Sequence, residues 1–249
     1  MSLVPTPHQI DIIIPAYNEG RRIEATLRKY LSWFDERVRL TVVLNGCTDN
    51  TLSVVQGIAQ LYPGRIIVHN IAGSIGKGGA VLYGWQQSPC DVIGFVDADG
   101  ATPPEEYQKL LDQLGRYDGA IASRTLPGSQ IEQRQSTLRS VMSRAFSIVV
   151  RQMFHMPFDD TQCGAKVFHR RVLAPVVGYM QTRDMTFDVE LLARLHRNGA
   201  KVIEIPTRWI DQPGSAALGN RADFLRTGSQ MVRRLWQLRQ ELEKTKTPM

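Results

Sequence analysis

The sharpest chemical feature of the chain is a pair of aspartates, Asp97 and Asp99, directly after the apolar run Val92–Val96. In a strand the side chains at positions i and i+2 share a face, so the two carboxylates leave the strand end together. A divalent ion such as Mg²⁺ is commonly held by one or two carboxylates together with substrate phosphates. The pair therefore predicts a site for a metal ion and a diphosphate, with Asp97 and Asp99 as the metal ligands and Mg²⁺ or Mn²⁺ as the cofactor.

An alternative interpretation of this segment is a turn that leads into a helix. Asp99 and Gly100 form a common turn pair. Thr102, Pro103 and Glu105 have the spacing of a capping box with proline at the first helical position. A turn accounts well for one aspartate and poorly for two, which favours the metal site.

A second polar segment, Gly76-Lys77-Gly78-Gly79, precedes a helical pattern. It lacks the spacing of a P-loop, and the dinucleotide-binding fingerprint fails at Val81. A cation at a helix N-terminus suits an anion, so we expect Lys77 to bind one. A glycine-rich turn without a ligand is the open alternative.

The elements that must position these residues alternate between β-rich runs and helical patterns. We predict strands at Asp11–Pro15, Leu40–Leu44, Ile66–His69 and Val92–Val96, with helices near Arg21–Phe34, Thr51–Leu61 and Gly78–Gln87 between them. This alternation is typical of a parallel, doubly wound α/β sheet. Three of the strands run into the polar loops PAYNEG, NGCTDN and DADGAT. Because ligands of such sheets bind at the carboxyl ends of the strands, we expect the three loops to meet at one edge.

The second half of the chain contains an amphipathic pattern over Thr137–Met153, a helix near Phe187–Arg197 and a strand at Lys201–Ile205. Apolar residues then recur at helical spacing at Phe224, Met231, Leu235, Leu238 and Leu242. Residues 221–249 hold seven basic and three acidic residues, which is +4 of the net charge of +6. We therefore predict one domain over residues 1–220, followed by a basic amphipathic helix and tail over residues 221–249.

The composition indicates a soluble globular class, with 249 residues of which 43% are hydrophobic and 22% charged. No apolar run reaches the roughly 18 residues that cross a bilayer, and we expect no signal peptide. Cys47, Cys90 and Cys163 fit neither a disulfide framework nor a zinc site. These cysteines favour the reducing cytoplasm as the location of the chain. The sequence contains no nucleic-acid-binding motif, so we expect no nucleic-acid partner. The basic tail leaves peripheral contact with an anionic membrane face open.

Seven motifs between Asp11 and Leu218 together resemble one family: IIIPAYNEG, NGCTDNT, GKGGAV, DADGAT, DTQCGAKVF, TFDVELL and IPTRWIDQPGS. They resemble the inverting GT-A glycosyltransferases that make polyprenyl-phosphate sugars, and most of all the dolichyl-phosphate glucosyltransferases. The resemblance implies the GT-A fold, a Rossmann-like, mostly parallel sheet with helices on both faces in a single domain. It also implies a metal-dependent hexosyltransferase that moves a sugar, expected to be glucose, from a UDP-sugar to a polyprenyl or dolichyl phosphate.

The resemblance assigns residues to the nucleotide-sugar. The first loop lines the base and ribose pocket, the Asp pair binds ribose and metal, and Asn45 stands where the family has an aspartate that accepts from the base. An asparagine still accepts through its amide oxygen, and its presence leaves the base preference open. The expected nucleotide-sugar residues are Pro15, Tyr17, Glu19, Asn45, Lys77, Asp97 and Asp99.

For the acceptor, the resemblance implies that Arg124 binds a phosphate and that Arg139 and Arg144 supply further cations from the helix near Thr137–Met153. Arg139 and Arg144, together with Arg151, are also explained as a solvated helix face or a surface resting on anionic lipid. Ala216 stands where the family has a lysine that faces the diphosphate. Arg221 is a candidate to replace that lysine.

Catalysis depends on which acceptor is used. A hydroxyl acceptor needs a base, for which Asp188 is the family-matched candidate and Glu190 the second; Asp188 is also explained as an acidic residue in the first turn of a helix. A phosphate is already anionic near neutral pH and needs positioning by Arg124 and Arg144 more than deprotonation. Two alternatives stay open: the same donor with a soluble hydroxyl or polysaccharide acceptor, and a non-catalytic nucleotide-sugar-binding protein.

Overall fold

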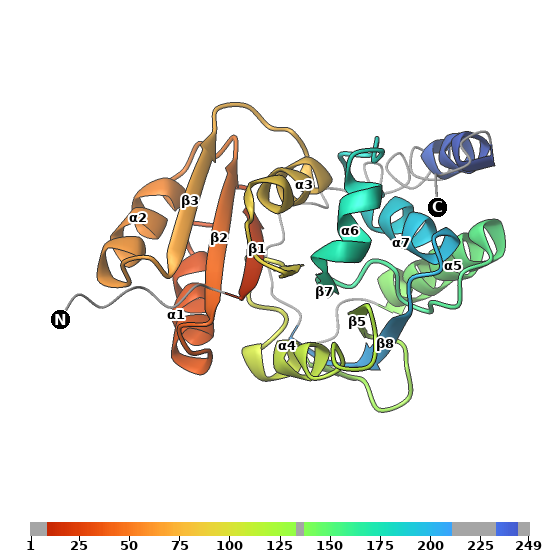
Figure 1. Ribbon diagram of the computed structural model, residues 1–249, viewed down its shortest axis with the longest axis horizontal. Coiled ribbons are helices and arrows are strands. Elements are labelled where there is room, and N and C mark those ends of the chain that lie inside the picture. The colour runs from red at the N-terminus through yellow and green to blue at the C-terminus, as the bar shows by residue number, and fades with distance from the viewer. Residues whose placement is uncertain (1–8, 133–136, 211–232, 244–249) are drawn as a thin grey trace.

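The computed structural model describes residues 9–132, 137–210 and 233–243, with side chains from residue 146 onward in the helix that begins at Thr137. A seven-stranded sheet runs through the molecule in the order β3-β2-β1-β4-β7-β5-β8 (Figure 1). Two hydrophobic clusters pack on its two faces, and helices contribute to both. The expected mostly parallel α/β sheet with helices on both faces is confirmed.

Four parallel strands form one half of the sheet: β1 (Ile10–Ala16), β2 (Val38–Asn45), β3 (Ile66–Ile71) and β4 (Val92–Val96). The connections between them are α1 (Ile23–Trp33), α2 (Thr51–Leu61) and α3 (Lys77–Gln87). Ile12 and Ile14 pack with α1 and α2, whereas Ile13 points to the opposite face and packs with α3. Burial on both faces explains why these strands read as continuous apolar runs.

The other half of the sheet contains a reversed strand. β7 (Ala165–His169) is antiparallel to β4 and to β5 (Gly119–Ser123), while β8 (Val202–Pro206) is parallel to β5. A small second sheet pairs β6 (Gln130–Glu132) with β9 (Arg208–Ile210). The remaining labelled helices are α4 (Pro104–Leu111), α5 (Thr137–Phe154), α6 (Arg170–Val177) and α7 (Phe187–Arg197). Because β7 runs backwards, the residues just before it lie beside the carboxyl end of β4.

The capping box expected at the start of α4 does not form. The helix begins at Pro104, with an extended Pro103 as N-cap and no side-chain cap hydrogen bond. The hydroxyl of Thr102 is buried without a hydrogen-bond partner. The carboxylate of Glu105 lies 2.5 Å from Arg208 instead. Glu105 in the first turn of α4 thus forms an ion pair with β9 and no cap hydrogen bond.

Residues 233–243 form a further helix, drawn in dark blue in Figure 1. Leu235, Leu238 and Leu242 are buried in the cluster that also contains residues of α3 and α7, as their helical spacing predicts. Phe224 and Met231 lie outside the described residues. The division of the chain at residue 220 stays a prediction.

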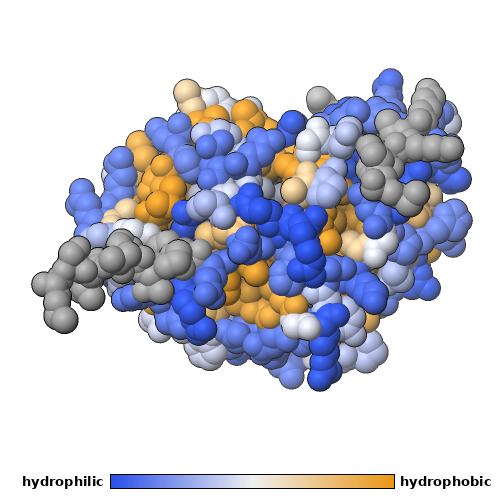
Figure 2. All heavy atoms as spheres, in the orientation of Figure 1, coloured by the Kyte–Doolittle hydropathy of each residue, from blue (hydrophilic) through white to orange (hydrophobic). Residues whose placement is uncertain are grey.

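Within the described ranges, no helix has both the length and the apolar character needed to cross a membrane. The face drawn in Figure 2 carries hydrophobic patches separated by hydrophilic side chains. Large exposed hydrophobic side chains come from separate elements, among them Trp33 on α1, Ile148 on α5 and Trp236 on the helix 233–243.

Candidate active site

The loops that follow β1 and β2 are tied together at the carboxyl edge of the sheet. The side-chain oxygen of Asn18, a residue with φ of 55°, accepts from the Thr48 N–H at 2.8 Å. The Gly20 N–H donates to the Asp49 carboxylate at 3.1 Å. β1 also pairs in parallel with β4. The loop that follows β4 and carries Asp97 and Asp99 therefore lies at the same edge. The predicted meeting of the three loops is confirmed.

Asp97 is held between a lysine and a glycine. Its Oδ1 lies 2.6 Å from Nζ of Lys77, and its backbone N–H donates to the Gly164 carbonyl at 3.0 Å. A Cβ on Gly164 would overlap the carboxylate of Asp97, so only glycine leaves room for this side chain. The structure thus joins Lys77 and Asp97, which belong to separate motifs of the sequence.

Several acidic groups repel one another at this edge. Burial raises the pKa of Asp99, and the neighbouring Asp97 raises it further. Burial also raises the pKa of Glu19, although its ion pair with Arg22 at 2.7 Å opposes the rise. Burial opposes the charge of Lys77, but the surrounding carboxylates, Asp97 above all, outweigh it and raise the pKa of that lysine. A bound cation would relieve the repulsion between the carboxylates.

The donor set suits a metal ion that is shared with a substrate. In the part of the chain that the structure describes, His, Cys, Asp and Glu side chains form no group of three or more around a possible metal position. Asp99 accepts from the Ala101 N–H at 3.0 Å and has further lone pairs to offer, whereas Lys77 competes for Asp97. A Mg²⁺ or Mn²⁺ ion with one or two carboxylates would complete its shell with diphosphate oxygens and water. Asp99 is therefore the better placed of the two expected ligands.

The glycines around Lys77 pack α3 against the start of α7. Gly76 has a φ of 78°, and a Cβ on it would overlap the Arg183 carbonyl. The Gly79 N–H donates to that same carbonyl at 3.0 Å. A Cβ on Gly78 would overlap Phe187. The close helix contact accounts for the glycines, and it satisfies one of the helix N-terminal donors that an anion would use.

Asn45 is buried at the end of β2, and its side-chain oxygen accepts from the Ile75 N–H at 2.7 Å. The oxygen expected to accept from a nucleotide base therefore already has a partner in the protein. The amide NH₂ is the group through which Asn45 can still donate to a base carbonyl. Pro15 lies in β1 opposite Val43, and Tyr17, in the loop that follows, is 49% exposed.

Asp188 lies in the first turn of α7 and forms a buried ion pair. Its Oδ1 is 2.6 Å from Nζ of Lys166, and the two side chains are 2% and 0% exposed. Burial raises the pKa of Asp188, against the lowering effects of Lys166 and Lys77. Lys77 thus interacts electrostatically with both Asp188 and Asp97, which connects the candidate base to the carboxyl edge.

Glu190, the second candidate for a base, has a structural role. Its carboxylate accepts from the backbone N–H groups of Gln181 and Thr182 and from the Thr182 hydroxyl. It also lies 2.7 Å from Arg194, and both side chains are buried. A carboxylate with this many donors holds the segment before α7 in place, and this finding corrects the expectation that it could serve as a base.

Arg124 is fixed at the carboxyl end of β5. Its backbone N–H, Nε and Nη2 all donate to the Asp160 carboxylate, at distances between 2.7 and 3.0 Å. Its guanidinium carbon lies 5.1 Å from the ring centroid of Trp209. Burial opposes the charge of Arg124, but Asp160 outweighs it and raises the pKa, with a smaller contribution from Asp97. The arginine is thus in electrostatic reach of Asp97.

The other expected phosphate contacts fall outside the described residues. Arg139 and Arg144 belong to the first part of α5, where the structure describes the helix but not the side chains. Ala216 and Arg221 belong to residues 211–232.

Four residues that complete this edge are not predicted by the sequence patterns: Arg22, Asp160, Lys166 and Trp209. Asp160 and Lys166 lie in DTQCGAKVF and Trp209 in IPTRWIDQPGS, so the signal was present in motifs already in use. A motif identifies residue types, however, and the partner of each side chain comes from chain segments far away in sequence.

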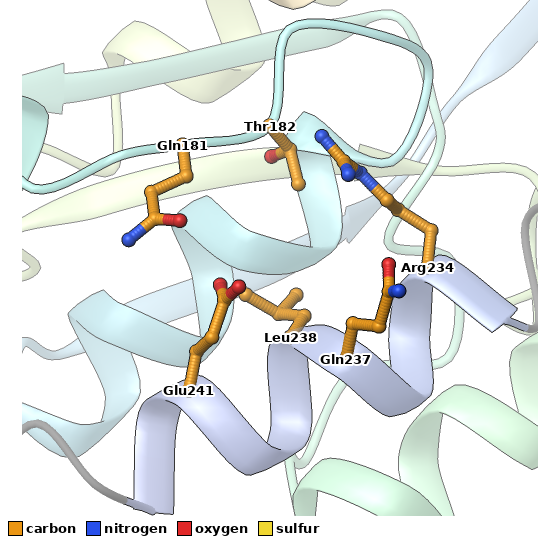
Figure 3. A pocket seen from close by; sticks show the side chains of 6 residues that line it. All are labelled: Gln181, Thr182, Arg234, Gln237, Leu238 and Glu241. Carbon is orange, nitrogen blue, oxygen red and sulfur yellow. The ribbon is translucent and has the colours of Figure 1, made fainter.

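Two hollows of the described structure lie away from this edge. The one in Figure 3 lies between Gln181, Thr182 and the helix 233–243, and its volume of about 20 Å³ suits a single water. Another of about 430 Å³ lies at the amino-terminal ends of β1 and β2, beside Trp33. The candidate site is therefore identified by the chemistry of its side chains and not by these hollows.

Comparison with known proteins gives the same assignment as the motifs. The family described as "Glycosyl transferase family 2" matches residues 11–176. Glycosyltransferase AglD of Haloferax volcanii is 29% identical over 237 residues, which is 92% of this chain and 37% of that protein. The dolichyl-phosphate beta-glucosyltransferase of Drosophila melanogaster is 30% identical over 223 residues, which is 83% of this chain and 68% of that protein. The chain thus spans little more than a third of the archaeal relative.

Solved structures share the fold at low sequence identity. Glucosyl-3-phosphoglycerate synthase from Mycobacterium tuberculosis, in complex with UDP, superposes with a TM-score of 0.68 and 15% identity, covering 93% of this chain and 80% of that one. Mannosyltransferase PcManGT from Pyrobaculum calidifontis, in complex with GDP-Man and Mn²⁺, gives 0.65 and 18%, covering 98% and 66%. These similarities show that the chain has the GT-A fold.

Proposed function

Since the chain belongs to glycosyl transferase family 2, we propose that it transfers a sugar from a nucleotide-sugar to a lipid phosphate. The donor is UDP-glucose, the acceptor is a polyprenyl or dolichyl phosphate, and the anomeric carbon is inverted. The observation that carries the proposal is a single sheet edge where Asp97 and Asp99 interact with Lys77, and Asp97 also with Arg124. A carboxylate pair that attracts a cation, next to an arginine that attracts an anion, suits a diphosphate donor and a phosphate acceptor.

For the donor, Asp99 would hold Mg²⁺ or Mn²⁺ together with the donor's diphosphate, and Asp97 would contact the ribose. When bound, the metal offsets the negative charge that develops on the leaving nucleoside diphosphate. Lys77, whose Nζ lies 2.6 Å from the Asp97 carboxylate, would donate to the diphosphate. Support comes from the raised pKa of Asp99 and from the glucosyl-3-phosphoglycerate synthase of M. tuberculosis, which was solved with Mn²⁺ and UDP-glucose.

For the acceptor, Arg124 places the phosphate so that one of its oxygens faces the anomeric carbon opposite the leaving diphosphate. A phosphate monoester is largely ionised near pH 7, so the attacking oxygen needs orientation more than deprotonation. The printed names of the Drosophila and Saccharomyces cerevisiae relatives, both dolichyl-phosphate beta-glucosyltransferases, support this acceptor class. Because such an acceptor is anchored in a lipid bilayer, we propose that the chain acts in the cytoplasm as a peripheral protein at a membrane face.

One observation favours a second candidate, transfer to a hydroxyl of a soluble or polysaccharide acceptor. Burial raises the pKa of Asp188, which moves this carboxyl toward the range where a general base is effective. A hydroxyl must lose its proton, and Asp188 would accept it. The presence of both Asp97 and Asp99 counts against a third hypothesis, that the chain binds a nucleotide-sugar without catalysing its transfer.

Two linked measurements test the proposal. A thermal-shift screen of sugar nucleotides with and without Mn²⁺ should single out UDP-glucose, because a ligand at 100 times its Kd stabilises by about 2.7 kcal/mol. UDP release from that donor should then rise on addition of undecaprenyl phosphate in detergent. Release that rises with a soluble hydroxyl acceptor and not with the lipid phosphate supports the second candidate. Stabilisation without any release supports the non-catalytic reading.

A further inference from the structure

The surroundings of Arg124 leave only part of its guanidinium free. An arginine side chain carries five N–H donors in a planar fork. Nε and Nη2 each donate to the Asp160 carboxylate, and Trp209 covers one face of the plane. The side chain is nevertheless 25% exposed. The donors that remain are both N–H groups of Nη1 and the second N–H group of Nη2, and they form the free edge of the guanidinium.

The groups that hold Arg124 are themselves held. Asp160 is 3% exposed, and its backbone N–H donates to the Glu204 carboxylate at 2.6 Å. The Asp159 N–H donates to the other oxygen of Glu204 at 2.8 Å. Trp209 belongs to β9 and is 8% exposed. Segments from β8, β9 and the loop before β7 thus converge on one arginine at the end of β5.

We propose that Asp160 and Trp209 are positioning residues that hold Arg124 with its free edge toward the acceptor phosphate. This inference rests on the proposed function, in which Arg124 binds that phosphate. A mobile arginine loses rotamer freedom when it binds an anion, whereas an arginine already fixed by a carboxylate and a ring loses little. Fixing the plane of the guanidinium also fixes the direction from which the phosphate oxygen approaches the donor.

A purely structural role for the two residues makes a different prediction. A buried ion pair is weak grounds for stability, because desolvation of the charges offsets their attraction. If Asp160 and Trp209 served only the fold, their loss would change the KM for the donor and the KM for the acceptor alike. The change would be the same in a chain that lacks Arg124.

The test compares Trp209→Leu, which removes the aromatic face, with Trp209→Phe, which keeps one. Initial rates are measured with UDP-glucose, Mn²⁺ and undecaprenyl phosphate in detergent. We expect Trp209→Leu to raise the KM for the lipid phosphate at least about fivefold, with the KM for UDP-glucose within about twofold of the unaltered chain. Trp209→Phe should stay within about twofold for both substrates. In an Arg124→Ala background, Trp209→Leu should have no further effect on the acceptor KM.

Asp160→Asn supplies a second, independent variant if Trp209→Leu does not fold. An amide of the same size cannot accept from Nε and Nη2 together, so the acceptor KM should rise in the same selective way. Equal effects on both substrates, or an unchanged effect of Trp209→Leu in the Arg124→Ala background, would overturn the inference. An Arg124→Ala variant with a normal acceptor KM would instead refute the phosphate role of Arg124 in the proposed function, and the inference with it.

Discussion

Asp99 is the side chain on which donor binding should depend most. It sits at the end of β4, its pKa is raised by burial and by Asp97, and it has lone pairs left for a metal ion. We expect Asp99→Ala to weaken binding of UDP-glucose in Mn²⁺ at least tenfold, or about 1.4 kcal/mol. Calorimetry measures the affinity. Asp112→Ala, an exposed aspartate beside the hollow at the opposite edge of the sheet, is the matched control and should bind normally.

Arg124 and Asp188 separate the two acceptor classes. With a lipid phosphate as acceptor, Arg124→Ala removes a charge-assisted contact and should lower transfer at least tenfold, or about 1.4 kcal/mol. Asp188→Asn should cost less, because no proton has to be removed from an ionised acceptor. With a hydroxyl acceptor the order reverses, since loss of a base costs roughly 10²- to 10⁴-fold.

The measurement is the transfer rate of both variants to undecaprenyl phosphate. Asp188→Asn leaves Lys166 buried without its ion-pair partner, so rates are taken well below the melting temperature of each variant. A large defect in Asp188→Asn beside a nearly normal Arg124→Ala would contradict the phosphate-acceptor mechanism.

At the level of elements, the contact between α3 and α7 places Lys77 beside Asp97. A Cβ on Gly78 would overlap Phe187, whereas a Cβ on Gly57, in the middle of α2, meets nothing within 4 Å. Gly78→Ala should therefore destabilise by about 1–3 kcal/mol through overpacking. Gly57→Ala should stabilise by about 0.4–1 kcal/mol because it restricts the unfolded chain. Urea unfolding of both variants tests this, and equal effects would disprove the close helix contact.

At the level of the whole molecule, the site should lower stability in the absence of metal. The pKa of Asp99 is raised in the folded chain, so the folded state holds this proton more tightly than the unfolded state. The carboxyl therefore favours the folded state at low pH, and that contribution is lost as pH rises through the folded pKa. We expect Asp99→Asn, measured without metal at pH 7, to raise Tm by about 2–4 °C, the shift that corresponds to about 1 kcal/mol.

The gain in Tm for Asp99→Asn should shrink as the pH is lowered, because the raised pKa of Asp99 lets the folded chain take up this proton before the unfolded chain does. Thermal melts from pH 7 downward provide the measurement. A gain that stays constant with pH would show that the charge of Asp99, disfavoured by burial and by Asp97, is not its cause.

The helix 233–243 extends the core of the molecule. Leu238 is buried in the cluster that contains α3 and α7, whereas Trp236 on the same helix is 59% exposed. Leu238→Ala should destabilise the whole chain by about 2–5 kcal/mol. Trp236→Ala should change stability by no more than about 0.5 kcal/mol. A single unfolding transition that shifts only in the first variant would show that this helix folds with the sheet.

Local pattern was enough to predict much of the fold. Val92–Val96, Thr51–Leu61 and Phe187–Arg197 have the bounds predicted from apolar periodicity and flanking residues, and the parallel order of the first strands follows from their alternation with helices. The sequence also gives the residue types of the loops directly, and these types predict that the Asp pair and the three polar loops lie at one edge. The bounds of these elements and the residue types of these loops depend on residues that are neighbours in the chain, so the sequence is sufficient to predict them.

Only the tertiary structure decided which side chains meet. β7 is as short as β4, but the buried Lys166 interrupts its apolar residues, so no strand pattern marks it, and its reversed direction has no signal in the sequence either. That reversal brings Gly164 against Asp97 and Lys166 to within ion-pair distance of Asp188. The sequence gives no sign that the side-chain oxygens of Asn45 and Glu190 have partners. In the structure the Ile75 N–H donates to Asn45, and the N–H groups of Gln181 and Thr182 donate to Glu190. Hydrogen bonds and ion pairs between distant segments depend on strand order and register, which the packing of the whole chain determines.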